Sequence, residues 1–153
     1  SGRLSRPCTL GDTPLNTADE DDFGMEMRPG SVCRDAPIKV GGHPGWLLSL
    51  LGNRFTLIVA HKEEYPVDLS ELDAQEDLQV ISIGTAVKTE LPVTIIEDTG
   101  GLISRCYQLK DGGAYLVRPD QHVCARWRRF DPQKVLAALD RATGKSLDTG
   151  TVQ

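Results

Sequence analysis

The stretch GAYLVRPDQHVCARWRR, residues 113–129, decides the fold of this chain. Residues 114–118 and 122–128 are rich in side chains that favour strands. Residues 119–121, Pro-Asp-Gln, are typical of a tight turn, because proline fixes the backbone angle of the first corner residue. The stretch therefore predicts a β-hairpin.

A helix is predicted directly after this hairpin. Asp131 is a favourable N-cap residue, and Pro132 is a favourable first helical residue. Gly144 is expected to end the helix. The apolar side chains between these ends recur on one helical face, and they are Val135, Leu136, Leu139 and Ala142.

Two earlier segments, residues 55–60 (FTLIVA) and 78–83 (LQVISI), are predicted to be buried strands. Residues 93–96 (VTII) are expected to be a further short apolar strand or extended piece. Apolar side chains on both faces of a strand are typical of a sheet that is covered on both sides.

The segments around these strands predict turns and short helices. Residues 35–38 are expected to be extended, because a residue before proline avoids helical angles. Residues 41–45 are predicted to be a turn, and residues 46–51 a helical turn. Further short helices are expected at 70–77 and 102–109. The first strand, helical turn and following strand then predict a right-handed crossover between parallel strands.

This order of elements predicts an α/β fold, the thioredoxin-like sandwich, with a four- or five-stranded mixed sheet and flanking helices. The domain is expected to span residues 31–144, and residues 145–153 form a polar tail. Residues 1–30 hold few apolar side chains and an acidic run at 19–22, which is interpreted as a solvated charge run. They predict an irregular N-terminal arm, which links to an upstream domain or wraps around this one.

Composition excludes several functional classes. The 153 residues carry a net charge of −5, so a general nucleic-acid binder is not expected. No apolar run approaches the roughly 20 residues of a membrane-spanning helix. There is no basic-then-apolar leader and the chain begins at Ser1 without Met, so a processed chain or a piece of a longer one is expected.

The four cysteines, Cys8, Cys33, Cys106 and Cys124, include no C-x-x-C pair. This spacing argues against a zinc ribbon and a thioredoxin-type dithiol. Four reduced thiols in a cytoplasmic protein are expected, although an even number also allows two disulfides. His122 and Cys124 lie two residues apart, but two ligands are too few for a metal site.

A redox thiol of a thioredoxin-like protein lies at the start of the first helix, where the helix dipole lowers its pKa. Residues 42–46, expected at that position, contain no cysteine. The residues before the hairpin, where such proteins commonly carry a cis-proline, are Gly113 and Ala114. We therefore predict no catalytic, cofactor-binding or metal-binding residue in this chain.

Aromatic and basic side chains on the second hairpin strand are candidate interface residues. Arg126 and Arg128 are expected to share one face of the strand, while Trp127 points to the other. These arginines are either solvated at a strand edge or held for a partner. Tryptophan and arginine are favoured at interfaces, so Trp46, Trp127, Arg126 and Arg128 are the predicted packing sites.

Several segments together resemble one family. They are residues 1–5 (SGRLS) followed by Pro7, residues 29–31 (PGS) with 35–38 (DAPI), residues 51–57 (LGNRFTL) and above all 113–123 (GAYLVRPDQHV), followed by Arg126. This pattern resembles the C-terminal domain of FAD-dependent aromatic-ring hydroxylases of the phenol-hydroxylase-like and polyketide-hydroxylase-like kinds. The resemblance runs from about residue 1 to residue 144, and the LVRPDxHV hairpin is its most specific part.

The resemblance implies a function for the parent chain and a role for this part. In such enzymes upstream FAD and substrate domains hydroxylate an aromatic ring with NAD(P)H and O₂. The C-terminal domain is non-catalytic and packs on those domains and, in some members, on a second subunit. The alternatives are a standalone redox enzyme acting through Cys33 or Cys106 and a small-ligand-binding module.

Overall fold

Parallel strands form the centre of one sheet in the computed structural model, which describes residues 15–24, 26–61 and 66–144. Strand β3 (Phe55–Ala60) lies beside β5 (Leu78–Ile83), and β7 (Val93–Asp98) lies on the other side of β5. All three strands run parallel, and β3 and β5 lie where buried strands were predicted. Their parallel pairing requires long connections over the sheet faces.

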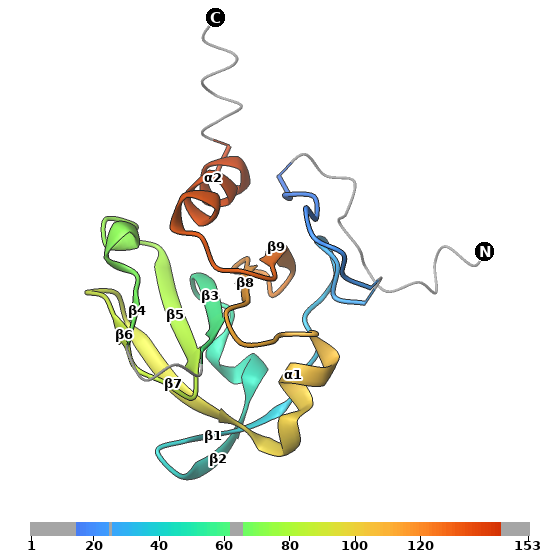
Figure 1. Cartoon of the computed structure of the whole chain (residues 1–153), viewed down its shortest axis with the longest axis vertical. Coiled ribbons are helices and arrows are strands. Elements are labelled where there is room, and N and C mark those ends of the chain that lie inside the picture. The colour runs from blue at the N-terminus through green and yellow to red at the C-terminus, as the bar shows by residue number, and fades with distance from the viewer. Residues whose placement is uncertain (1–14, 25, 62–65, 145–153) are drawn as a thin grey trace, which may run out of the picture.

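The predicted hairpin is present on the other side of β3. Strand β8 (Ala114–Val117) pairs antiparallel with both β3 and β9 (Val123–Trp127). Figure 1 shows the hairpin under helix α2 (Pro132–Ala142), which follows it directly. Asp131 caps this helix, because its Oδ1 accepts a hydrogen bond of 2.9 Å from the backbone N–H of Gln133.

A second hairpin widens the sheet at its opposite edge. Strands β1 (Pro37–Val40) and β2 (His43–Trp46) are antiparallel, and β1 also pairs antiparallel with β7. The sheet therefore has seven strands in the order β2-β1-β7-β5-β3-β8-β9, wider than the four or five expected.

The predicted parallel crossover from residues 35–38 to β3 is wrong. Gly41 and Gly42 have φ angles of +56° and +81°, which suit a two-residue hairpin turn. The chain then returns at once as β2, although Pro44 and Gly45 are poor strand formers. Residues 42–46 thus lie in an edge hairpin and not at the start of a helix.

The remaining elements are short. They are the 3-10 turns η2 (Leu47–Leu50), η3 (Ser70–Leu72) and η4 (Thr99–Gly101), helix α1 (Leu102–Cys106), and a separate pair of parallel strands, β4 (Val67–Asp68) and β6 (Val87–Lys88). The helices expected at 46–51, 70–77 and 102–109 are thus shorter than predicted.

Two apolar cores lie on the two faces of the sheet. The first core contains Ile38, Ile58, Ile96, Tyr107 and Tyr115, and it is closed by η2 and α1. The second core contains side chains of β3, β5, β8, β9, η3 and α2. On α2, Val135, Ala138 and Leu139 are buried, whereas Leu136 is only half-buried.

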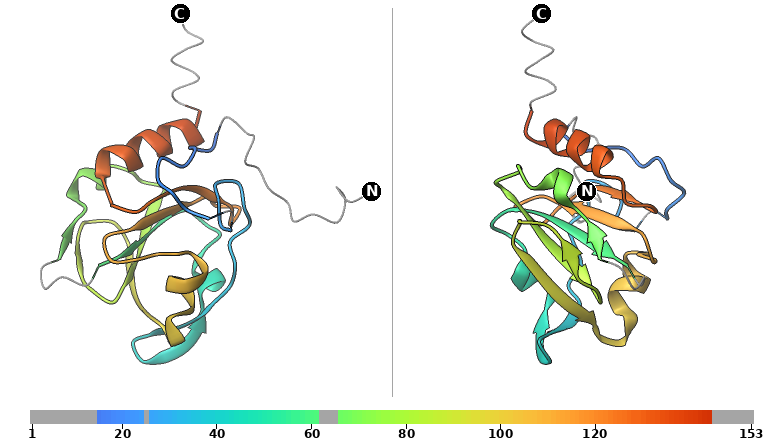
Figure 2. Two further views of the ribbon diagram at one scale, coloured as in Figure 1. Left: turned by 45° about the vertical axis from the view of Figure 1, so that its right-hand side comes forward. Right: turned by 60° about the vertical axis from the view of Figure 1, so that its left-hand side comes forward.

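The N-terminal arm, here its described residues 15–24 and 26–30, runs along β9 with no helix or strand of its own. Figure 2 shows it beside α2 and the hairpin. The Thr17 N–H donates to the carbonyl of Cys124 at 3.1 Å, and the Gly30 N–H donates to that of Val123 at 2.7 Å. These bonds occupy the free edge of β9, which would otherwise be open to strand addition.

Leucine-to-alanine substitutions should distinguish buried leucines from a half-buried leucine on α2 by their effect on stability. Leu116 is fully buried and Leu139 is 5% exposed. We expect Leu116→Ala or Leu139→Ala to cost about 2–5 kcal/mol and to lower the melting temperature by roughly 10 °C. The matched control is Leu136→Ala on the same helix, which should cost less than about half as much in a thermal melt. Equal shifts for Leu136 and Leu139 would contradict this packing.

Candidate functional site

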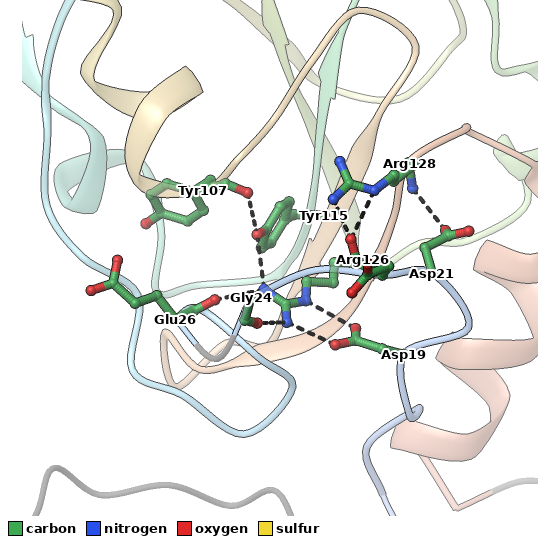
Figure 3. A network of polar contacts seen from close by, with 9 residues as sticks. Asp19, Asp21, Gly24, Glu26, Tyr107, Tyr115, Arg126 and Arg128 are labelled. Atoms are coloured by element: carbon green, nitrogen blue, oxygen red, sulfur yellow. Dashed lines mark hydrogen bonds and ion pairs between the residues drawn. The ribbon is translucent and has the colours of Figure 1, made fainter.

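The face of β9 that carries Arg126 is covered by the N-terminal arm. Arg126 is only 2% exposed, so the interpretation of this residue as a solvated side chain is wrong. A buried guanidinium requires acceptors for its N–H groups and a negative charge nearby. The arm supplies both, as Figure 3 shows.

Arg126 binds the Asp19 carboxylate through two parallel hydrogen bonds. Its Nε donates to Oδ1 at 2.9 Å, and its Nη2 donates to Oδ2 at 2.7 Å. Nη2 also donates to the Gly24 carbonyl at 2.7 Å, and Nη1 donates to the Glu26 carbonyl at 2.6 Å. This fork geometry is the strong form of an arginine–carboxylate pair, and the carbonyl acceptors fix the backbone of the arm as well.

The charge on Arg126 survives burial because of these contacts. Burial alone opposes the charged form, but the hydrogen bonds with Asp19 and Tyr115 raise the pKa of Arg126 above its ordinary value. Arg126 therefore stays cationic, and Asp19 is its counter-ion within the same chain.

Arg128 holds the next part of the arm from the protein surface. Its backbone N–H donates to Oδ2 of Asp21 at 2.9 Å, and its Nε donates to the Asp22 carbonyl at 3.1 Å. Both guanidinium groups lie over the Phe23 ring, with the central carbon of Arg126 at 4.4 Å and that of Arg128 at 4.5 Å from the ring centroid. Two cation–π contacts thus hold one aromatic side chain of the arm.

A chain of tyrosines extends this network into the first core. The Tyr115 hydroxyl accepts from Nη1 of Arg126 at 3.4 Å and donates to the Tyr107 carbonyl at 2.5 Å. The Tyr107 hydroxyl donates to the Arg34 carbonyl at 2.5 Å. Burial raises the pKa of both phenols, which remain neutral donors at physiological pH. The arm is therefore bonded to the sheet, to α1 and to the segment that leads into β1.

The predicted interface residues do not form one cluster. Arg126, Trp127 and Arg128 are adjacent on β9, and Trp127 is buried in the second core. Trp46 lies on β2, at the opposite end of the sheet, and is 56% exposed. Sequence reasoning missed Asp19, Phe23 and the carbonyls of the arm as partners of the arginines. The acidic run at 19–22 was the available signal, but it was interpreted as a solvated charge run.

The hairpin turn with the most specific sequence pattern is held by its own polar side chains. Arg118 Nη2 donates to Oδ2 of Asp120 at 2.9 Å, and the His122 N–H donates to Oδ1 of Asp120 at 3.2 Å. Gln121 takes a φ of +65° and donates from Nε2 to the Leu48 carbonyl at 3.2 Å. The RPDQH pattern thus closes a turn and attaches it to η2.

The described thiols are poorly suited to redox catalysis. Cys33 and Cys124 are buried, and desolvation raises the pKa of each from its ordinary 9.0 to about 12. A catalytic thiol requires the opposite shift. Cys106 is half-buried, and Cys8 lies outside the described residues. All three described cysteines are free.

The residue before β8 also departs from a redox site. A Cβ atom on Gly113 would lie 3.0 Å from Cδ1 of Leu109 and 3.1 Å from the Lys110 carbonyl, so a larger side chain fits poorly. The central strand β3 is followed by His61, and residues 62–65 lie outside the described part.

Among the described residues, no three His, Cys, Asp or Glu side chains are grouped closely enough to hold a metal ion. The described helices are also too short or too polar to cross a membrane.

The described residues offer no fitting site for FAD. A Rossmann-type phosphate site needs a glycine-rich loop between a strand and the N-terminus of a helix. The sequence lacks G-x-G-x-x-G. A described helix, α1, follows the parallel strand β7 across Gly100 and Gly101, but it has only five residues. The N–H groups of Ile103 and Ser104 at its start already donate to the Asp98 carboxylate at 2.8 and 3.0 Å. We assign no cofactor contact to this chain.

Comparison with known proteins finds similarity to flavoprotein monooxygenases. The chain is 30% identical over 117 residues to 4-methyl-5-nitrocatechol 5-monooxygenase from a Burkholderia species, over 75% of this chain and 21% of that protein. Aklavinone-11 hydroxylase, solved with FAD and aklavinone, matches 89% of this chain and 26% of its own, with a TM-score of 0.67 and 19% identity. No protein-family model matches.

Two further solved structures define the fold. The flavin-dependent monooxygenase PieE, solved with FAD and substrate, matches 88% of this chain and 24% of its own, with a TM-score of 0.60 and 24% identity. A mitochondrial 2-Cys peroxiredoxin from Plasmodium falciparum matches 80% of this chain and 96% of its own, with a TM-score of 0.53 and 13% identity.

These findings confirm the resemblance to FAD-dependent hydroxylases and the thioredoxin-like α/β fold. The chain spans only about a fifth to a quarter of the monooxygenases it matches. It is therefore similar to one part of those longer proteins.

Removal of the Arg126 guanidinium should release the arm. Arg126→Leu leaves Asp19 and two carbonyls without donors, and breaking a buried ion pair costs about 3–5 kcal/mol. We expect a lower melting temperature and faster hydrogen exchange at the amides of residues 15–24. The control is Arg128→Ala, whose exposed side chain should cost about 1 kcal/mol or less. Unchanged exchange in Arg126→Leu would show that the ion pair does not hold the arm.

The buried thiols should resist a thiol reagent in the native state. Burial raises the pKa of Cys33 and Cys124 from 9.0 to about 12 in the folded state. Their contribution to the stability of the folded state is therefore complete below about pH 9 and is lost as the pH rises toward 12. At about pH 8 we expect at most two of the four cysteines to react with Ellman's reagent, and all four after denaturation. Rapid native labelling that disappears in Cys33→Ser would contradict the burial of this thiol.

Proposed function

We propose that this chain is the non-catalytic, thioredoxin-like C-terminal domain of an FAD-dependent monooxygenase that hydroxylates aromatic substrates with NAD(P)H and O₂. Its role is packing: it binds the upstream FAD and substrate domains and contributes to contacts with a second subunit. The observation that carries this proposal is the alignment of most of the chain with only a fifth to a quarter of several monooxygenases.

The chemistry of the described residues supports a packing role. The peroxiredoxin that matches along nearly its whole length shares the fold, but here the two fully buried thiols have raised pKa values. The strongest polar cluster, around Arg126, has its donors directed to Asp19 and to backbone carbonyls of the same chain. This arrangement stabilises a fold rather than a reacting group.

The buried arm supports a direct link to an upstream domain. Asp19, Phe23 and the carbonyls of Gly24 and Glu26 are fixed on β9, so the chain enters the domain along a defined path. A linker held in this way limits the orientations that an upstream domain can take. A cytoplasmic location belongs to the same proposal and is supported by three free described cysteines. The acidic net charge supports a partner other than nucleic acid.

The reading frame of the gene provides the decisive test. We expect the codons upstream of Ser1 to encode a Rossmann-type FAD domain with a G-x-G-x-x-G motif. A start codon within a few residues of Ser1 would overturn the proposal.

The purified 153-residue chain provides a second test. It should be colourless, should not reduce insulin disulfides and should not consume peroxide, because the described residues offer no FAD site and no activated thiol. Flavin bound in equal amount to the protein, or thiol turnover abolished by Cys33→Ser, would count against a non-catalytic domain.

A further inference from the structure

One face of the sheet is left uncovered at the β2 edge. In antiparallel pairs, directly opposite residues point to the same face. Trp46 lies opposite Pro37, and both Pro44 and Glu97 lie opposite Lys39. Val93 and Ile95 join this face because side chains alternate along β7. We define the Trp46 face as these seven residues: Pro37, Lys39, Pro44, Trp46, Val93, Ile95 and Glu97.

Neither core reaches the Trp46 face. The neighbouring side chains Ile38 and Ile96 point the other way and are buried in the first core. The second core, which lies on the same side of the sheet as the Trp46 face, contains no buried side chain of β7, β1 or β2 among the described residues. Figures 1 and 2 show why: α2 lies over the hairpin β8–β9, and the hairpin β1–β2 lies at the opposite end of the molecule.

Large apolar side chains gather on this uncovered face. Trp46 is 56%, Ile95 46% and Val93 36% exposed, and they are three of the four large exposed apolar side chains among the described residues. The fourth is Val32, beside the turn of the other hairpin. An exposed apolar cluster of this kind is typical of an interaction surface.

The edge of the sheet discourages one mode of association. Pro44 lies in the middle of the edge strand β2 and has no N–H to donate to an added strand. A partner therefore packs against the face of the sheet and does not extend it.

The charges and shape of the Trp46 face are complementary to those of the same face on a second copy. It carries one Lys39 and one Glu97, and neither makes an ion pair with another described residue. In a two-fold contact each residue can meet the opposite charge of the other copy. A groove of about 220 Å³ on this face is lined by Trp46 together with Pro37, Lys39, Pro44 and Thr99. The face thus has both a protruding side chain and a hollow.

We propose that the Trp46 face packs on the same face of a second copy of this chain in a two-fold symmetric dimer. Trp46 of each copy fills the groove of the other, and Lys39 lies opposite Glu97. This inference rests on the packing role given under Proposed function, and it assigns that role to one surface.

Sedimentation velocity of the full 153-residue chain tests the proposal. We expect a reversible dimer with a dissociation constant on the order of 0.1 mM, because the patch is small. Trp46→Ser should weaken the dimer more than about tenfold, as expected for an interface tryptophan. The control is Val32→Ser, which removes another exposed apolar side chain elsewhere and should associate as the wild type does.

Charge reversal tests the symmetry of the contact. Lys39→Glu and Glu97→Lys should each weaken the dimer roughly fivefold. An equimolar mixture of the two single variants should restore association, because opposite charges then meet only between the two copies, whereas Lys39 and Glu97 of one copy lie on neighbouring strands. Thermal melts of each variant separate loss of association from loss of folding. Iodide quenching should fall as protein concentration rises, because Trp46 is the exposed tryptophan and Trp127 is buried.

Two results would overturn the proposal: a wild-type chain that stays monomeric up to about 1 mM, or a Trp46→Ser variant that associates as tightly as the wild type. Neither result bears on the reading frame, the flavin content or the thiol activity. Failure of this inference is therefore distinguishable from failure of the proposed function.

Discussion

The buried guanidinium of Arg126 fixes the path of the N-terminal arm across the sheet. A positive charge that is 2% exposed would be very costly without a counter-ion and acceptors for its N–H groups. Asp19 and the carbonyls of Gly24 and Glu26 satisfy it, so the arm must follow β9 closely enough for all three to reach one side chain. Phe23 then contacts both Arg126 and Arg128, and the arm covers the edge of β9.

This constraint makes the two ends of the sheet unlike each other. At the β9 end, the arm and α2 cover the sheet, and exposed Lys134 and Glu20 join them at 2.8 Å. At the β2 end, Trp46 and Ile95 remain exposed on one face, and only Pro44 protects the edge. A domain that is closed where its own chain enters and apolar at the far end is suited to joining other structural units.

Burial also decides which chemistry the thioredoxin-like fold can perform here. The peroxiredoxin has the same fold as this chain. In this chain, however, Cys33 and Cys124 lie inside the two cores, where desolvation favours the neutral thiol. Their position, more than their number, argues against thiol catalysis. Cys33 also lies near the Tyr107 hydroxyl, in a region that joins the arm to α1.

The sequence by itself determined the elements whose causes are local. The apolar runs of β3 and β5, the turn at residues 119–121 and the Asp131-Pro132 helix start depend on side chains close in the chain, and each was predicted at its correct place. The tertiary structure alone decided the strand β2, the pairing of β1 with β7 and the burial of Arg126. Pro44 and Gly45 form a strand only because β1 lies beside them, and Arg126 meets Asp19 across 107 residues of sequence. A local sequence pattern contains no information on contacts between distant segments such as the acidic run at 19–22 and strand β9. The charge of Arg126, which the sequence alone allowed to be solvated, is therefore found to be buried only in the folded structure.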